Sequence, residues 1–215
     1  MTRKYYLAGM LLTAAVLVAT VIAYPHLPDS IATHWNIHNQ VDGYGPKWTV
    51  YVAGPGLMAF VMLLMYCLPW FSPKNFEVDS FRSTYLQIML VLLCVAAYFF
   101  AVFLWAIFGH AVNMGRALVG GGCLAIVLCG NLMGKIRRNF FMGVRTPWAL
   151  ANERVWNATH RLAAKTMVAS GLVGLALTAA SPNFWLVLVV LTIGLFAPAV
   201  YSFAFYKQLE RRGEL

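Results

Sequence analysis

The chain has 215 residues, of which 61% are hydrophobic and only 11% are charged. Ordinary soluble domains carry about 25% charged residues, so this composition cannot cover a water-exposed surface and excludes a soluble enzyme. Sixteen Lys and Arg against seven Asp and Glu give a net charge of +9, a balance also found in nucleic-acid-binding proteins.

Six apolar stretches account for more than half of the chain. Each is close to the roughly 20 residues that a helix needs to cross the hydrocarbon layer. The sequence therefore predicts an all-α membrane protein with six transmembrane helices, over residues 5–23, 49–70, 84–108, 117–134, 166–181 and 184–206. The connections are too short to hold cores of their own, so function is expected in the two longest, residues 24–48 and 135–165.

The basic residues predict which side of the membrane each connection faces. Lys and Arg near helix ends are retained in the cytoplasm. With the N-terminus inside, fourteen of the sixteen lie on the cytoplasmic side, and only Lys47 and Arg116 lie outside. Both termini are therefore predicted to be cytoplasmic, and this topology explains the net charge without direct binding of nucleic acid.

Glycine and proline residues mark several of the predicted helices. Gly54-Pro55-Gly56 and Pro198 are expected to kink or locally break their helices because proline lacks an N–H. Such a break could serve as a hinge or pocket, or only as a packing kink. Small residues four apart allow helices to approach closely in lipid, which predicts that the fourth and fifth helices pack together, at Gly130, Gly134, Ser170 and Gly174.

The outer connection, residues 24–48, combines turn residues with apolar side chains. Its apolar side chains predict an ordered extracellular cap over the outer helix ends; they are Leu27, Ile31, Trp35, Ile37, Val41 and Trp48. His34, His38 and Asp42 recur every four residues and would share one face of a helix, as in a metal site. Asn39 makes such a helix doubtful, and His34 and Asp42 could instead hydrogen-bond to the backbone and hold the loop.

The same connection resembles a known module. Leu27-Pro28, Ile31, His34, Asn36, Val41-Asp42-Gly43 and Lys47, after a first transmembrane helix, are similar to the DUF1648 module at the N-terminal end of SdpI-type membrane proteins. The family usually has glycine where Asn39 stands and proline where Ala32 stands. Asn tolerates the left-handed conformation, so the turn is expected to survive. The resemblance implies that the cap binds a ligand or partner through His34, Asn36, Asp42, Gly43 and Lys47.

The inner connection begins with a cluster of cations. Lys135, Arg137, Arg138 and Arg145 surround Asn139 and Gly143 just before a predicted helix. The cluster suits an anion site for a phosphate, an anionic headgroup or an acidic partner. Ordinary anchoring to anionic lipid is the simpler explanation of the cations, but it does not explain the neighbouring Asn, Trp, Thr and His residues.

A helix is predicted to follow this cluster. Thr146 is a typical N-cap, and Pro147 suits the first helical position. Apolar residues then recur at helical spacing, which predicts an amphipathic helix at the cytoplasmic interface ahead of the fifth span; they are Trp148, Ala151, Val155, Thr159 and Leu162.

This stretch carries a second and more specific resemblance. Gly134-Lys135-x-Arg137-Arg138-Asn139-x-x-x-Gly143-x-Arg145-Thr146-Pro147-Trp148, followed by Trp156-x-x-Thr159-His160-Arg161, is similar to the signature loop of the SdpI family. The resemblance implies a DUF1648-like module over residues 1–70 and an SdpI-like module over 71–215, with the signature loop over 134–165. It also implies ligand or partner binding by the matching residues, which are Lys135, Arg137, Arg138, Asn139, Gly143, Arg145, Thr146, Pro147, Trp148, Trp156, Thr159, His160 and Arg161.

The family resemblance implies a function as well. It indicates a multi-pass protein of a bacterial or archaeal inner membrane that gives immunity to a secreted toxic peptide and sequesters a soluble repressor at the inner face. A lipid-binding or small-anion-binding or transport protein is the alternative, using the Lys135–Arg145 cluster. A metal-dependent membrane enzyme would need His34, His38, Asp42 or His160, but no catalytic or cofactor motif is present. Homo-oligomerisation stays open.

Overall fold

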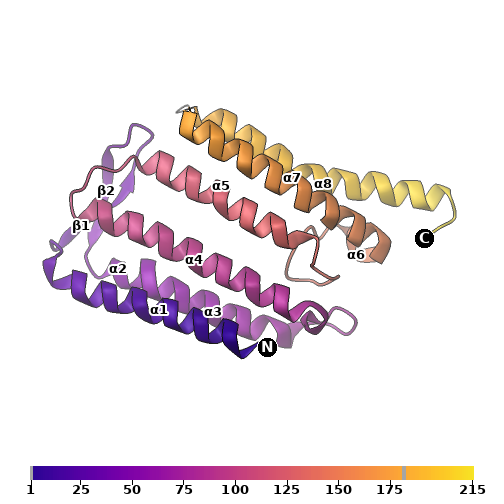
Figure 1. The fold of residues 1–215 in the computed structure, drawn as a ribbon, viewed down its shortest axis with the longest axis horizontal. Helices are drawn as coiled ribbons and strands as arrows, with labels where there is room; N and C mark the ends of the chain where they lie inside the picture. Colours follow the sequence, from indigo (N-terminus) through magenta and orange to yellow (C-terminus); the bar gives the residue numbers. More distant parts are fainter. Residues whose placement is uncertain (1, 181–182) are drawn as a thin grey trace. The chain divides into compact units, whose positions relative to one another are not determined.

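The computed structural model describes residues 2–180 and 183–215, and it has the expected all-α multi-pass architecture (Figure 1). Among these residues, six helical segments are long and apolar enough to cross a membrane: Arg3–His26, Thr49–Phe71, Val78–Ile107, Met114–Met133, Glu153–Ala180 and Phe184–Arg211. An even number of crossings would place both termini on the same side of a membrane, and that this side is the cytoplasm stays a prediction.

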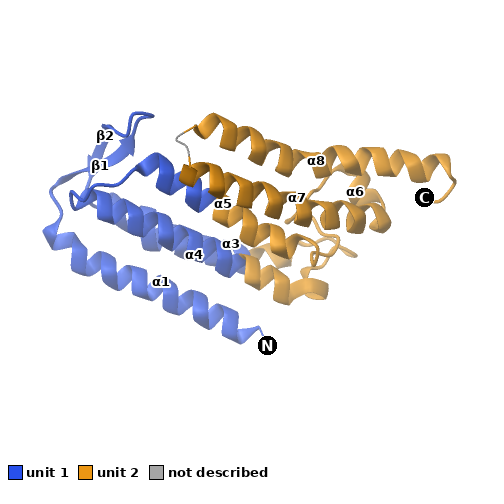
Figure 2. Cartoon of the chain, turned by 45° about the horizontal axis from the view of Figure 1, so that its top comes forward, with its two compact units in different colours: residues 1–66, 89–122 blue, residues 67–88, 123–215 orange. Residues whose placement is uncertain are grey.

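Two compact units make up the chain (Figure 2). Unit 1 comprises Met1–Tyr66 and Met89–Gly122, and unit 2 comprises Cys67–Ile88 and Cys123–Leu215. The helices α4 (Arg82–Ile107) and α5 (Met114–Met133) contribute residues to both units. The module boundary between residues 70 and 71 stays a prediction.

The outer connection of unit 1 folds as a β-hairpin after α1 (Arg3–Ala23). Strand β1 (Ser30–Trp35) pairs antiparallel with β2 (Val41–Pro46), with register shifts on both sides of His34. Beneath the hairpin, Leu27 and Ile31 are buried together with Val50 and Phe100. The cap is therefore ordered as expected, but as strands. Burial of apolar side chains on one face of the hairpin holds it in place.

Gly54-Pro55-Gly56 interrupts the second span as predicted. The span consists of α2 (Thr49–Tyr51), a π-helical turn (Val52–Gly56), α3 (Leu57–Cys67) and a 3-10 turn (Leu68–Phe71). Pro55 cannot donate to the helix ladder, and a wider turn accommodates the missing bond. Gly54 lies against Phe100, since a Cβ at residue 54 would lie 2.5 Å from that ring. By contrast, α8 (Phe184–Arg211) continues through Pro198 without a break.

In unit 2, α7 (Glu153–Ala180) runs alongside α8 (Figures 1 and 2). The predicted packing of α5 on α7 is present. A Cβ on Gly130 would lie 2.8 Å from Met167 Cβ, and one on Gly171 would lie 2.6 Å from Val127 Cγ2. Ser170 instead faces α8, where a Cβ on Gly194 would nearly touch its hydroxyl. These glycines allow the close helix contacts that lipid-embedded proteins use for packing.

The structure differs from the separate interfacial helix expected before the fifth span. A short helix, α6 (Pro147–Ala151), ends at the extended residue Asn152, and α7 then continues from Glu153 through the whole span. The Asn152 side chain causes the interruption, since its Oδ1 accepts the N–H groups of Arg154 at 2.8 Å and Val155 at 3.3 Å. The helical periodicity of residues 153–165 belongs to the spanning helix itself.

Candidate functional site

Asn139 organises the first part of the signature loop from inside. Its side chain is fully buried. Its Oδ1 accepts the N–H groups of Phe141 and Met142, both at 2.8 Å, and its Nδ2 donates to the carbonyls of Arg137 at 2.8 Å and Met142 at 3.2 Å. Four side-chain bonds replace the secondary structure that residues 137–142 lack, because buried backbone groups need partners.

Trp156 and His160 attach α7 to the same loop. The buried Trp156 Nε1 donates to the Ile136 carbonyl at 2.8 Å, and the Val144 N–H donates to His160 Nε2 at 3.0 Å. His160 Nδ1 lies 2.9 Å from the Trp156 carbonyl. An imidazole that donates from Nδ1 and accepts at Nε2 is the neutral tautomer. Both ring nitrogens therefore have partners within the protein, Nε2 in the loop and Nδ1 in α7.

Gly143 completes this contact because no other residue fits beside His160. Its φ is +95°, in the region that favours glycine. A Cβ at residue 143 would meet the His160 ring nitrogen Nε2 at a separation too short for any real contact. Gly143 thus has a structural role in the signature.

The signature therefore divides into buried and accessible residues. Asn139, Trp156, Thr159 and His160 are buried, and the Thr159 hydroxyl has no hydrogen-bond partner among the described residues. The residues that solvent or a partner can reach are the exposed Lys135, Arg137, Arg145, Pro147 and Arg161 and the half-buried Arg138, Thr146 and Trp148. Any ligand of the signature loop must contact this second set.

Several accessible residues also have partners within the protein. Arg145 Nη1 donates to the Phe140 carbonyl at 2.5 Å, and Arg138 Nη1 donates to the Leu150 carbonyl at 3.3 Å. Thr146 caps α6 as predicted, since its Oγ1 accepts the Ala149 N–H at 3.2 Å, and it also bonds with Ser202 at 2.7 Å. Two of the four cations, Arg138 and Arg145, are thus bound to carbonyl groups of the protein itself.

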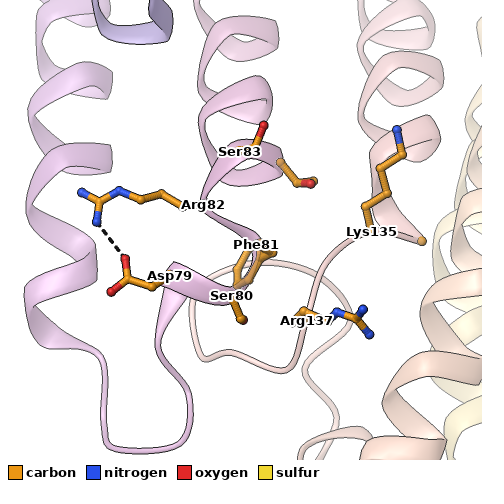
Figure 3. Close-up of a pocket in the computed structure, with 9 residues that line it drawn as sticks. Asp79, Ser80, Phe81, Arg82, Ser83, Lys135 and Arg137 are labelled. Carbon is orange, nitrogen blue, oxygen red and sulfur yellow. Dashed lines mark hydrogen bonds and ion pairs between the residues drawn. The ribbon is translucent and has the colours of Figure 1, made fainter. Parts of the chain in front are cut away.

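Of the four loop cations, Lys135 and Arg137 line a pocket, to which α4 contributes a further cation, Arg82. This pocket of 530 Å³ lies between residues 79–84, at the start of α4, and the beginning of the signature loop (Figure 3). It brings together two segments that are some fifty residues apart in sequence. Sequence patterns could not reveal it, since only the fold brings the start of α4 beside Lys135.

The hairpin residues predicted to bind a ligand mainly stabilise the hairpin. His34 Nδ1 lies 2.5 Å from Asp42 Oδ1, so these residues pair with each other rather than with backbone as expected. Asn36 Oδ1 accepts the N–H groups of His38 at 2.9 Å and Gln40 at 3.0 Å. Gly43 lies opposite His34, where a Cβ would approach His34 Cβ to 2.9 Å.

The metal-binding arrangement considered from sequence is not formed. Because the segment is a hairpin, His34, His38 and Asp42 share no helical face, and His38 lies in the turn. Across residues 2–180 and 183–215, no group of three or more His, Cys, Asp or Glu side chains could hold a metal ion.

Lys47 closes the base of the hairpin. Its Nζ lies 2.8 Å from Asp29 Oδ1 and 5.3 Å from the centre of the Tyr24 ring. The hydrogen bond with Lys47 lowers the pKa of Asp29, and the same bond raises the pKa of Lys47. Exposed ion pairs of this kind contribute little stability, so this pair mainly fixes the position of the Lys47 side chain.

Asn39 has a role that sequence reasoning did not find. Its φ of +62° confirms the left-handed turn expected there. In addition, its Nδ2 donates to the Val112 carbonyl at 2.8 Å, and its Oδ1 accepts the Met114 N–H at 2.7 Å. The hairpin turn is thereby joined to the first residue of α5. The sequence contained one sign of this role, because a residue with a side chain, Asn39, stands where the resembling module usually has glycine.

Replacing Trp156 with phenylalanine should lower the free energy of unfolding by about 2 kcal/mol, because the buried Ile136 carbonyl loses its donor and a small cavity forms. Trp148→Phe is the matched control, since Trp148 is half-buried and packs on Phe203 at 4.8 Å between ring centres. Denaturation of both variants in detergent micelles tests this, and equal losses would contradict the role given to the Trp156 N–H.

Comparison with known proteins agrees with the sequence resemblance. Residues 135–202 match the SdpI/YfhL protein family, and residues 11–59 match a domain of unknown function, DUF1648. The chain is also 24% identical over 210 residues to Immunity protein SdpI of Bacillus subtilis (strain 168), which covers 96% of this chain and 98% of the relative. No solved structure matches it significantly. The chain is thus a multi-pass cell-membrane protein whose signature loop lies in the segment that matches the SdpI/YfhL family and whose hairpin lies in the segment that matches DUF1648.

Proposed function

We propose that the chain is an immunity protein of the cell membrane that protects its host against a secreted antimicrobial peptide. The observation that carries this proposal is the similarity to Immunity protein SdpI along nearly the whole of both chains. Similarity among apolar spans alone would be weak support, because membrane helices share composition. Here the family match also begins at Lys135 and includes Asn139, Trp156 and His160, whose side chains hold the signature loop in shape.

In this proposal the hairpin meets the peptide on the outer face. The hairpin is anchored below by its buried residues and at its base by Lys47. Its upper part leaves large apolar side chains in the open, with Ile37 92% exposed and Tyr44 68% exposed. Exposed apolar groups on an ordered support are suited to contact an amphipathic peptide at a membrane surface.

The second part of the proposal concerns the inner face. Sequestration of a soluble repressor would use the accessible cations of the signature loop, among them Arg145 and Arg161. Signalling would require that the loop bind the repressor more tightly when peptide occupies the hairpin, since a ligand shifts an equilibrium only through differential affinity. The helix α5 begins at the contact with Asn39 and ends where the signature loop starts, so it is the element to examine for such coupling.

Survival of challenged cells tests the proposal. A Bacillus subtilis strain 168 derivative without its own SdpI would express this chain and be exposed to the peptide against which that SdpI acts. The wild-type chain should restore survival. Ile37→Ser should reduce that survival at least about tenfold, because a buried large apolar side chain contributes about 1.5–3 kcal/mol to binding.

His38→Ser is the matched control for this experiment, since His38 is an exposed neighbour in the same turn. It should protect as well as wild type. Equal survival with and without the wild-type chain would remove the immunity proposal. Equal protection by wild type and Ile37→Ser would remove the role of the hairpin tip alone.

A further inference from the structure

The pocket at the start of α4 has an unbalanced charge. Among the residues that the structure describes, Asp79 is the only carboxylate that lines it, and Asp79 Oδ1 already pairs with Arg82 Nη1 at 2.7 Å. Within the described part of the chain, neither Lys135 nor Arg137 lies within salt-bridge distance of an acidic side chain. The lining therefore carries two positive charges that the protein itself does not neutralise.

The polar groups of the pocket include hydrogen-bond donors suited to an anion. Three hydroxyl-bearing residues, Ser80, Ser83 and Thr84, are among those that line the pocket, and the Ser83 Oγ also accepts a bond from Gln87 Nε2 at 3.5 Å. Figure 3 shows the Lys135 side chain extending away from the loop, in the same direction as the Ser83 hydroxyl. The Arg137 guanidinium points away from Ser80. Lys135 is therefore the lining cation chosen for the test below.

The backbone that carries both cations is held from the interior. Ile136, between them, is buried, and its carbonyl accepts the Trp156 N–H. The Arg137 carbonyl accepts a bond from Asn139. Fixing the backbone before a ligand arrives reduces the entropy that binding would otherwise cost. The buried signature residues thereby keep Lys135 and Arg137 at the pocket.

We propose that this pocket binds the phosphate group of a phosphomonoester. Such a group carries a charge of about −1.5 to −2 at neutral pH and three acceptor oxygens, which matches two cations and several hydroxyl donors better than a carboxylate would. A volume of 530 Å³ is also larger than a phosphate ion needs and falls in the usual range for organic ligands. The phosphate belongs to a lipid headgroup or to a soluble phosphate ester, and the proposal does not depend on the immunity function.

Native mass spectrometry of the full-length protein in detergent tests the proposal. The probes are phosphatidic acid and glycerol 3-phosphate, which present the same phosphomonoester with and without acyl chains. Phosphatidic acid should bind with a stoichiometry of one, and Lys135→Gln should weaken this binding about tenfold through loss of a charged hydrogen bond. Lys74→Gln is the matched control, because Lys74 is an exposed lysine of the same unit outside the pocket.

The outcomes separate the two sources of phosphate. Binding of phosphatidic acid alone assigns the site to a lipid headgroup, and comparable binding of glycerol 3-phosphate assigns it to a soluble ester. Unfolding curves should be unchanged in Lys135→Gln, since the side chain is exposed. The proposal is overturned by absence of saturable binding of both probes, by equal affinity in wild type and Lys135→Gln, or by an equal loss in Lys74→Gln.

Discussion

Replacing Gly143 with alanine should lower the free energy of unfolding by about 3 kcal/mol. Part of this loss comes from a side chain forced into the left-handed region, which costs roughly 1–2 kcal/mol. The rest arises because the new methyl group occupies the position of His160 Nε2 and breaks the bond from the Val144 N–H, which costs about 1–3 kcal/mol when the groups are buried. His160 cannot move aside easily, since its ring stacks on Trp156 at 4.0 Å between centres.

Gly109→Ala provides a control that separates the two effects. Gly109 has a φ of +82°, but a Cβ there would meet nothing within 4 Å. The free energy of unfolding of this variant should fall by only about 1–2 kcal/mol, the cost of placing a side chain in the left-handed region. Both free energies can be measured by denaturant titration in mixed micelles. If the two variants lost the same stability, the contact between residues 143 and 160 would not be important for folding.

Replacing Asn139 with alanine is expected to cost about 2–4 kcal/mol and to disorder the start of the signature loop. The alanine leaves the N–H groups of Phe141 and Met142 without their acceptor in a buried site, and such groups cost about 1–3 kcal/mol each when unpaired. Hydrogen exchange measures the effect directly, because both amides should lose their protection while amides in α8 keep theirs.

Asn131→Ala is the matched control for Asn139→Ala. Asn131 lies on α5 near the same loop, its side chain is exposed, and it makes no hydrogen bond among the side chains that the structure describes. Its replacement should change the free energy of unfolding by less than about 0.5 kcal/mol. Retained protection of the Phe141 and Met142 amides in Asn139→Ala would show that the loop holds its shape by other means.

The signature loop shows where sequence reasoning reached its limit. The start of α6 was predictable because Thr146 and Pro147 act through local hydrogen bonds and a fixed backbone angle. The difference in role between Asn139 and Arg137 could not be predicted, since both are polar residues in one motif. Only the folded loop, in which Asn139 bonds to the backbone of residues 137–142, makes Asn139 a buried support and leaves Arg137 accessible.

The outer connection shows the same limit. Its apolar residues correctly indicated an ordered cap, although two of those residues, Ile37 and Trp48, are exposed. A short segment with two register shifts has no regular alternation of apolar and polar residues. Without that alternation, a pattern search cannot distinguish a hairpin strand from a loop.

The amino-acid sequence by itself determined the six membrane spans and the break at Gly54-Pro55-Gly56, and the resemblance to the DUF1648 module indicated the left-handed turn at Asn39. Each of these follows from hydrophobic length or from the backbone freedom of a few adjacent residues. The tertiary structure alone decided that Asn152 separates α6 from α7, that Asn39 is joined to α5, and that Lys135 lines a pocket with Ser83. These features depend on hydrogen bonds and packing in the folded chain, some between residues tens of positions apart, and local residue patterns do not encode which distant segments meet.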